Sequence, residues 1–379
     1  MAEAIFVNGG NEATVNAALA RAASSIVAIS PNQGGYTWSH QIPPVIVAGS
    51  FDLSGPVRMP ASSRLLAEGA VFKCGSLAST TFAIEGQGWR SEISGSLTIA
   101  DAPNGVRWNT GDLGNNLTMG SSLISGVHFA GVRGTAVDIQ CRSSVVVVER
   151  CVFDKVDKIA HSRMCDQLTI RDCFCRPTGT AGVTPITTSW GRLMVDGGIF
   201  TPAANARTQA SLAWIELEAA GDRQEQMVLV RGARFGGEYG GMAVVLNRCP
   251  PRTSFPSAPG VSITLRDVHA SNTPSADEYA ADPPIGAPLV LLAELPNSLV
   301  IDGCIGMVRP KHLVDFLPWV DGPALAAGMS ATGLNNRCIL QLQRGATITP
   351  GEEAPEVLRP FVVGPAAQPV GPARPLPAQ

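Results

Sequence analysis

The chain of 379 residues is long enough for one extended domain or for two ordinary ones. Only 16% of its residues are charged and 6% are aromatic, whereas Gly (40) and Pro (29) are plentiful, which disfavours a helical bundle and favours short strands joined by turns. The formal net charge of −3, without a basic run, excludes the electrostatic signature of a nucleic-acid-binding protein.

The sequence gives no sign of a targeting or membrane-inserted segment. The start, MAEAIFVNGGNEA, has no basic region followed by an apolar one, so no secretory signal is predicted. No stretch approaches the roughly 18 uninterrupted apolar residues that a membrane-spanning helix needs. We therefore expect a protein made in a cytoplasm and not inserted into a membrane.

The first expected element is a helix over residues 11–24, NEATVNAALARAAS. Asn11 is a capping residue, and Val15, Ala18, Leu19 and Ala22 follow at helical spacing. A lone amphipathic helix ahead of a run of strands is suited to cover the open end of a stack of strands. Residues 1–24 are therefore predicted to form an N-terminal segment with a capping helix.

A short word then recurs seven times along the chain. Its copies are SLISGVHF, VVVERCVF, LTIRDCFC, LMVDGGIF, VLVRGARF, ITLRDVHA and LVIDGCIG. We call the aliphatic residue at the third position of each word its anchor; the anchors are Ile124, Val148, Ile170, Val195, Val230, Leu265 and Ile301. Successive anchors lie 24, 22, 25, 35, 35 and 36 residues apart, and the residue three after each anchor is small or compact.

Periods of this size indicate a solenoid, and each word indicates an inward aliphatic pair, a tight polar corner and another inward residue. A minimum near 22 residues with a variable excess favours a right-handed parallel β-helix over residues 25–349. A leucine-rich repeat is excluded because its asparagine ladder is missing. A β-sandwich is disfavoured because few Asn-Gly or Asp-Gly turns separate the strands.

The order of these elements resembles the pectate-lyase-like superfamily of right-handed β-helices, and within it the phage tailspike branch. The resemblance rests on the AALARAA helix, on the stretch SGPVRMPASSRLLAEGAVFK and on the coils that follow, over roughly residues 11 to 310. It implies an all-β fold and a place on a virion. Because only ten residues precede the helix in this sequence, the head-binding domain that many tailspikes carry there is not expected.

No cofactor or metal site is predicted. The nine cysteines form no CxxC pair, so we interpret them as small buried hydrophobic residues. Asp154 and Asp157 alternate with lysines, which is typical of a solvated turn and not of a calcium site. Asn109-Thr110-Gly111-Asp112 is the only partial match to the sequence motifs of polygalacturonases, and it carries little weight by itself.

The best enzymatic constellation is Trp214-Ile215-Glu216-Leu217-Glu218. In a strand, Ala213, Ile215 and Leu217 would face the core, while Trp214, Glu216 and Glu218 would face outward. Carboxyl groups two residues apart are about 6 to 7 Å apart at the backbone, close to the separation that glycoside hydrolysis uses. The exposed indole of Trp214 would then bind carbohydrate. The simpler alternative is that the glutamates keep an outer face soluble and the tryptophan packs against another subunit.

Two functions remain open after these considerations. The first is a phage virion surface structural protein, a trimeric spike, fibre or capsid-decorating (cement) protein, which acts in attachment or particle stabilisation. The second is a polysaccharide-degrading enzyme, a glycoside hydrolase or lyase of the β-helix class, with Glu216 and Glu218 as catalytic residues. Six Trp and three Tyr are few for a sugar-binding groove, which favours the first. We expect the chain to form a homotrimer and to bind other virion proteins and host surface polysaccharide.

The last segment, residues 350–379, contains too many prolines for a helix or a central strand. It is expected to be an extended, Pro-rich arm. Within it, Leu358, Phe361, Val362 and Val363 form a compact apolar patch, which predicts that the arm docks on a neighbouring chain or another virion protein.

Overall fold

The computed structural model describes thirteen stretches of the chain, which together form two compact units, Met1–Thr178 and Gly179–Gln379. The described residues are 3–24, 42–111, 120–142, 144–180, 182–201, 212–218, 226–237, 242–249, 260–272, 289–307, 314–316, 329–330 and 338–343. The predicted arm, 350–379 with Leu358, Phe361, Val362 and Val363, lies outside them. The docking of this arm stays a prediction, as do the predicted boundaries of the three segments at residues 24 and 349.

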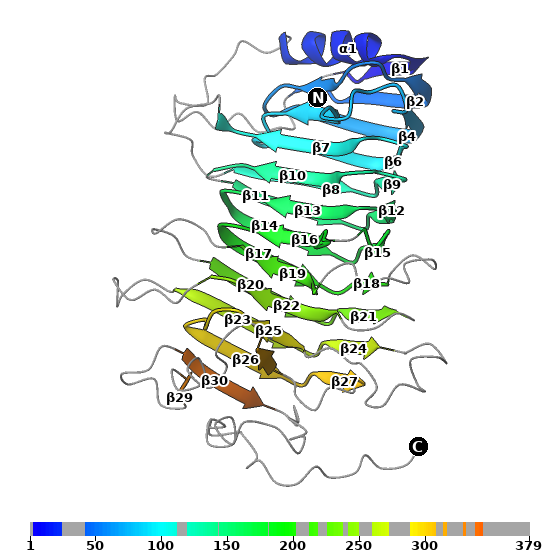
Figure 1. The fold of residues 1–379 in the computed structure, drawn as a ribbon. Helices are drawn as coiled ribbons and strands as arrows, with labels where there is room; N and C mark the ends of the chain where they lie inside the picture. The colour runs from blue at the N-terminus through cyan, green and yellow to red at the C-terminus, as the bar shows by residue number, and fades with distance from the viewer. Residues whose placement is uncertain are drawn as a thin grey trace. The chain divides into compact units, whose positions relative to one another are not determined.

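The described residues of the first unit form one helix and fifteen strands, most of which are labelled in Figure 1. They are β1 (Ile5–Gly10), α1 (Glu12–Ser24), β2 (Val45–Asp52), β3 (Val57–Met59), β4 (Arg64–Lys73), β5 (Phe82–Gly86), β6 (Glu92–Ala100), β7 (Asn104–Asn109), β8 (Gly120–Ser125), β9 (His128–Ala130), β10 (Thr135–Gln140), β11 (Ser144–Glu149), β12 (Val152–Val156), β13 (Lys158–Ser162), β14 (Cys165–Arg171) and β15 (Phe174–Pro177). Two parallel ladders run through this unit. One joins β1, β2, β4 and β6 and continues as the pairs β8/β9, β11/β12 and β14/β15; the other joins β3, β5, β7, β10 and β13.

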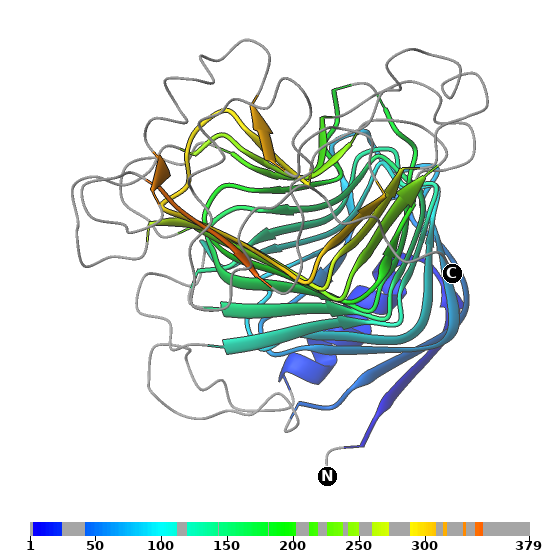
Figure 2. The ribbon, with the colours of Figure 1, turned by 90° about the horizontal axis from the view of Figure 1, so that it is seen from below.

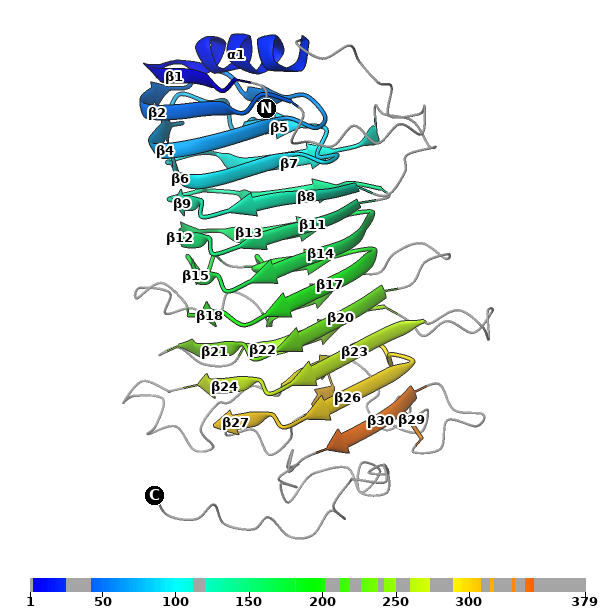
Figure 3. The same cartoon turned by 180° about the vertical axis from the view of Figure 1, so that it is seen from behind.

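The second unit repeats the same plan. Its strands are β16 (Ile186–Thr188), β17 (Gly191–Asp196), β18 (Ile199–Phe200), β19 (Ala213–Leu217), β20 (Gln226–Arg231), β21 (Arg234–Gly237), β22 (Ala243–Asn247), β23 (Val261–Arg266), β24 (His269–Asn272), β25 (Val290–Leu292), β26 (Ser298–Asp302), β27 (Ile305–Met307), β28 (Val314–Phe316), β29 (Met329–Ser330) and β30 (Cys338–Gln343). β17, β20, β23 and β26 lie side by side, with β18, β21, β24 and β27 after them in the chain (Figure 3). β16, β19, β22, β25 and β28 form the other ladder.

Every pairing with an assigned register is parallel, so the predicted all-β class with parallel strands is confirmed. Seen from below, the two ladders of the first unit, drawn in blue and cyan, lie on different sides of that unit (Figure 2). Parallel strands cannot be joined by two-residue hairpins, which explains why few hairpin turns were found in the sequence.

Helix α1 has the predicted buried face: Val15, Ala18, Leu19 and Ala22 are all buried. Asn11 accepts hydrogen bonds at its Oδ1 from the amides of Ala13 (3.1 Å) and Thr14 (3.3 Å), as an N-cap does. The helix contacts β1, β2 and β3. It is also tied to them by polar groups.

Two side chains of α1 make these polar ties. The Glu12 carboxylate accepts hydrogen bonds from the amide and hydroxyl of Ser54, at 3.0 and 2.9 Å. The amide of Arg58 donates to Asn16 Oδ1 at 2.6 Å. The accepted hydrogen bonds lower the pKa of Glu12, because they favour its charged form.

The anchors of the repeated word stack as the sequence predicts. Val148 lies opposite Ile124 in one neighbouring strand and opposite Ile170 in the other. In the second unit, the same register joins Val195 to Val230, Val230 to Leu265 and Leu265 to Ile301. All seven anchors are buried, so the word marks one equivalent position in each repeat of a unit. We call each such repeat, with its strands before and after the corner of the word, a coil.

The corner of each word has a left-handed backbone, which the residue types at this position do not reveal by themselves. The residue two after each anchor has a positive φ in all seven copies: Gly126 (72°), Arg150 (52°), Asp172 (49°), Gly197 (71°), Gly232 (61°), Asp267 (50°) and Gly303 (63°). We call this position the left-handed corner. Four of the seven residues are glycine because only glycine adopts this conformation without a steric cost.

The left-handed corner also carries a hydrogen bond from one coil to the next. The amide of Arg150 donates to the carbonyl oxygen of Arg171 at 3.0 Å, and the amide of Gly232 donates to that of Arg266, also at 3.0 Å. The ladder is thus continued through the bend, where the backbone groups would otherwise lose their partners. A coil with a different corner would break this continuity.

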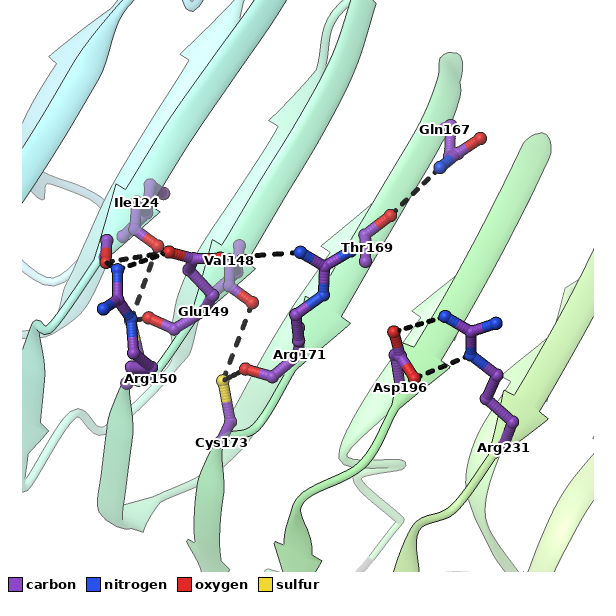
Figure 4. Close-up of polar contacts among 12 residues, drawn as sticks. Ile124, Val148, Glu149, Arg150, Gln167, Thr169, Arg171, Cys173, Asp196 and Arg231 are labelled. Carbon is purple, nitrogen blue, oxygen red and sulfur yellow. Dashed lines mark hydrogen bonds and ion pairs between the residues drawn. The ribbon is translucent and has the colours of Figure 1, made fainter. Parts of the chain in front are cut away.

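The residue just before the corner points outward and is usually charged (Figure 4). The Glu149 carboxylate lies 2.6 Å from Arg150 Nη2 and 3.8 Å from Arg171 Nη1. Asp196 accepts two hydrogen bonds of 2.7 Å from Arg231. Exposed pairs contribute only about 0–1 kcal/mol each, but opposite charges on adjacent coils favour this register over a slipped one.

The cysteines of the word are packed just after the corner. Cys151 and Cys173 are buried, and each thiol donates at 3.3 Å to the carbonyl oxygen two residues before it. Cys173 Sγ also lies 3.7 Å from the carbonyl oxygen of Val148, in the neighbouring coil (Figure 4). Eight cysteines are buried free thiols, so their interpretation as packing residues is confirmed for the described part of the chain.

The corner predicts a specific cost for adding a side chain there. At Gly232 a Cβ atom would meet no atom within 4 Å, so Gly232→Ala should be destabilised by the left-handed backbone alone, by about 1–2 kcal/mol. Gly75 is equally open but has no positive φ, so Gly75→Ala should be neutral or slightly stabilising. Urea denaturation of the two variants checks this, and equal effects would contradict the role of the corner.

The thiols should be unreactive in the native protein. Burial raises the pKa of Cys74 and of Cys165 to about 12, so neither forms the reactive thiolate at neutral pH. At pH 8 we expect a thiol reagent to label no cysteine of the Cys338→Ser variant before unfolding and all eight that remain afterwards. Rapid labelling of the native variant would show that the coils do not pack as described.

Candidate functional site

In the predicted catalytic strand, β19, every residue except the partly buried Glu216 is buried, and the expected exposure of Trp214 is wrong. Trp214 is 3% exposed, and its ring packs against Phe200 and Phe235 at centroid distances of 6.1 and 5.8 Å. A sugar ring therefore finds no exposed indole face here, which removes the basis of the predicted carbohydrate-binding role of Trp214.

The physical reason is that the alternation of faces fails at the start of β19. Ala213 packs with Leu246 and Leu291. Leu246 lies opposite Glu216 in the ladder, so Ala213 shares the Glu216 side and is not on the side of Ile215 as predicted. Trp214 correspondingly turns to the phenylalanines. Ile215 and Leu217 are fully buried, as expected.

Glu216 is held by ionic and polar contacts on both of its oxygens. Arg248 Nε lies 2.6 Å from Oε1, and the hydroxyl of Thr184 donates to Oε2 at 2.7 Å. The three residues come from three neighbouring segments of the second unit, so the carboxylate links adjacent coils. Both oxygens are occupied in an arrangement that suits a structural clamp.

Glu218 lies just beyond the end of β19 and is fixed through its main chain. Its amide donates to the carbonyl oxygen of Thr188 at 2.9 Å, and its own carbonyl oxygen accepts from Gln226 Nε2 at 3.2 Å and from the Cys249 thiol at 2.7 Å. The catalytic assignment of Glu216 and Glu218 stays a prediction that no contact here supports.

A polar hollow in the first unit is the stronger candidate for a binding site. It has a volume of about 440 Å³ and lies where β3, β5 and β7 end. Its polar lining includes Arg58, Glu85, Gln87, Arg107 and Asn109. This volume is within the range of about 300–1,000 Å³ that is typical of small-molecule pockets.

One row of outward residues supplies the charges of this hollow. Arg58 lies opposite Glu85, Glu85 opposite Arg107, and Arg107 opposite Asp138 in adjacent strands. The row continues to His161 in β13. It was not visible in the sequence because the outward residues recur at irregular intervals and differ in charge from coil to coil.

Further along this row, Asp138 is buried between cationic side chains. Its side chain is 3% exposed and accepts hydrogen bonds from Arg107 Nε at 3.0 Å and from Arg163 Nη2 at 2.9 and 3.1 Å. His161 Nδ1 lies 3.9 Å away. A carboxylate this deeply buried needs such partners, because the loss of its hydration is compensated only by charged donors.

Comparison with known proteins identifies no family for the chain. No family model, no curated protein and no solved structure matches it. The assignment of a function therefore depends on the residues and their geometry.

The described residues contain neither a metal-binding cluster nor a membrane-spanning helix. No three side chains of His, Cys, Asp or Glu come together there so as to hold a metal ion. None of the described helices is long and apolar enough to cross a membrane.

The Asp138 cluster predicts an asymmetric response to substitution. Arg107→Met with Arg163→Met leaves a buried carboxylate without compensation, which should lower the free energy of unfolding by about 3–5 kcal/mol. Asp138→Asn should cost less, about 1–2 kcal/mol, because the two guanidinium groups are 37% and 39% exposed and can turn to water.

Chemical denaturation of these variants measures both effects. Adding Asp138→Asn to the arginine pair variant should restore part of the lost stability, because it removes the uncompensated charge. Equal losses for Asp138→Asn and the arginine pair would show that the burial of Asp138 does not determine the energetics.

Proposed function

We propose that the protein is a phage virion surface structural protein, a trimeric spike, fibre or capsid-decorating protein that acts in attachment or particle stabilisation. The observation that carries the proposal is the constant stacking of the repeated word, with the left-handed corner in every copy. Such stacking makes a rigid scaffold in which each coil supports the next. A structural role needs this rigidity and needs no reactive centre.

The finer architecture belongs to the same proposal. Each coil would consist of a strand, the left-handed corner, a second strand and a third strand in the other ladder, wound as a right-handed parallel β-helix over residues 25–349. Parallel connections are almost always right-handed, which supports this hand. The contacts of α1 with β1, β2 and β3 support its role as a cap on the first coil.

The contacts of the predicted acid pair count against the alternative enzyme. Glycoside hydrolysis needs one carboxyl group free to donate a proton and another free to act as base or nucleophile. Glu216 instead has Arg248 on one oxygen and Thr184 on the other. Its position suits a contact that holds coils together, and this favours the structural protein over the polysaccharide-degrading enzyme.

The resemblance in the AALARAA helix and the SGPVRMPASSRLLAEGAVFK stretch supports the place on a virion, which the protein would reach after synthesis in the host cytoplasm. Its partners would be two further copies of the chain and other virion proteins, and its surface ligand would be host polysaccharide.

The proposal is tested by electron microscopy and by an activity assay on the same preparation. We expect purified protein to form trimers, to bind phage particles and to release no reducing sugar from bacterial polysaccharides. Cleavage that is lost in the variant Glu216→Gln/Glu218→Gln, whose folding is verified by circular dichroism, would overturn the proposal in favour of the enzyme. A monomer that binds no particle would also contradict it.

A further inference from the structure

The hollow of the first unit contains two charged side chains that the described residues leave without a partner. Arg58 on β3 and Glu85 on β5 are of opposite sign and lie opposite each other in the ladder. Strands in a ladder are about 4.8 Å apart, so these side chains are within reach of an ion pair. No ion pair or hydrogen bond joins the side chain of either to another residue in the described ranges, although both line the hollow.

The second cation beside Glu85 is already engaged elsewhere. Arg107 lies opposite Glu85, but its guanidinium donates to Asp138 at 3.0 Å and lies over the ring of Phe82, 3.9 Å from the ring centroid. Glu85 is therefore flanked by two arginines and bonded to neither. The buried carboxylate of Asp138 takes the cation that would otherwise neutralise Glu85.

Two amide side chains add hydrogen-bond donors to the same hollow. The side-chain oxygen of Gln87 accepts from the amide of Ala61 at 3.2 Å, and that of Asn109 accepts from the amide of Gly111 at 2.8 Å. With these oxygens used, each amide presents its NH₂ group. The hollow thus offers one guanidinium and two NH₂ groups as hydrogen-bond donors. It offers a single carboxylate as an acceptor.

These groups select a ligand that carries both charges. A carboxylate would accept from Arg58 and from the NH₂ donors, and an ammonium group would pair with Glu85. A ligand of one sign would leave Arg58 or Glu85 covered and without a partner, which weakens binding. Among the described lining residues no aromatic side chain is present, so stacking of a neutral sugar is not favoured.

We propose that this hollow is a binding site for a zwitterion of the amino-acid type, either a free amino acid or the ends of a short peptide. Arg58, Gln87 and Asn109 bind its carboxylate, and Glu85 binds its ammonium group. The site is independent of Glu216 and Glu218, which belong to the second unit.

Calorimetric titration of the full chain with small probes tests the site. Glycine and diglycine are the zwitterionic probes; N-acetylglycine lacks the cation, and glycine methyl ester lacks the anion. We expect at least one zwitterion to bind with a Kd on the order of 1 mM or tighter, and each blocked probe to bind at least about tenfold more weakly. The comparison of glycine with diglycine distinguishes a free amino acid from a peptide.

Variants of the two free charges provide the second arm. Arg58→Gln and Glu85→Gln should each weaken zwitterion binding at least about tenfold, while Arg21→Gln, an exposed arginine on α1, should leave it unchanged. The exchange Arg58→Glu/Glu85→Arg should restore binding in part, because it keeps one charge of each sign in the hollow. A merely structural role would give no such recovery.

The proposal is overturned if neither zwitterion binds, if N-acetylglycine or glycine methyl ester binds as well as glycine, or if the single variants bind like the native chain. Unfolding temperatures of all variants show whether a loss of binding reflects a loss of fold. If both single variants have lowered unfolding temperatures, the exchange variant is the test. An exchange variant that folds like the native chain but does not recover binding contradicts the site.

Discussion

The left-handed corner is the constraint on which the rest of this structure depends. A parallel ladder requires that every coil bends at the same point and by the same amount, because the bend carries hydrogen bonds to the next coil. The corner meets this requirement with one residue at positive φ. Where that residue is not glycine, as at Arg150, the energetic cost is borne by the contacts of the coils on either side.

The columns of the core follow from the corner. Because every coil turns at the equivalent residue, the anchors before it and the small residues after it lie one above the other. Cys151 and Cys173 occupy the space just beyond the bend, where a small side chain with a weak donor also contacts the carbonyl oxygens there. The same geometry orders the outward charges, such as Glu149 and Arg171, along the edge of the bend.

Several outward carboxylates pair with arginines, whereas the carboxylate at one site in the first unit does not. Asp138 and Glu149 in that unit are paired with arginines, as is Glu216 in the second. These pairs join neighbouring coils and suit a scaffold. Glu85 and Arg58 face a hollow and are not paired with each other, although their register would allow it. A contrast of this kind separates residues that hold the fold from residues available to a ligand.

The sequence by itself determined the all-β class with parallel strands, the position of the helix and the alignment of the repeated words between coils. The anchors from Ile124 to Ile301 could be predicted because burial imposes the same requirement, an aliphatic side chain, in every coil. The helix face of Val15, Ala18, Leu19 and Ala22 followed from spacing alone. These are local or strictly periodic patterns, and such patterns can be read along a chain.

Only the tertiary structure decided the direction of Trp214 and the composition of the hollow. The side on which Trp214 packs depends on the irregular start of β19 and on its contacts with Phe200 and Phe235. One phenylalanine precedes Trp214 in the chain and the other follows it, at spacings that no local pattern predicts. Arg58, Glu85 and Arg107 lie on adjacent strands through the stacking of coils of unequal length, and their residue types follow no repeat. Outward positions are not selected by the core, so the sequence alone carried no pattern from which their neighbours could be inferred.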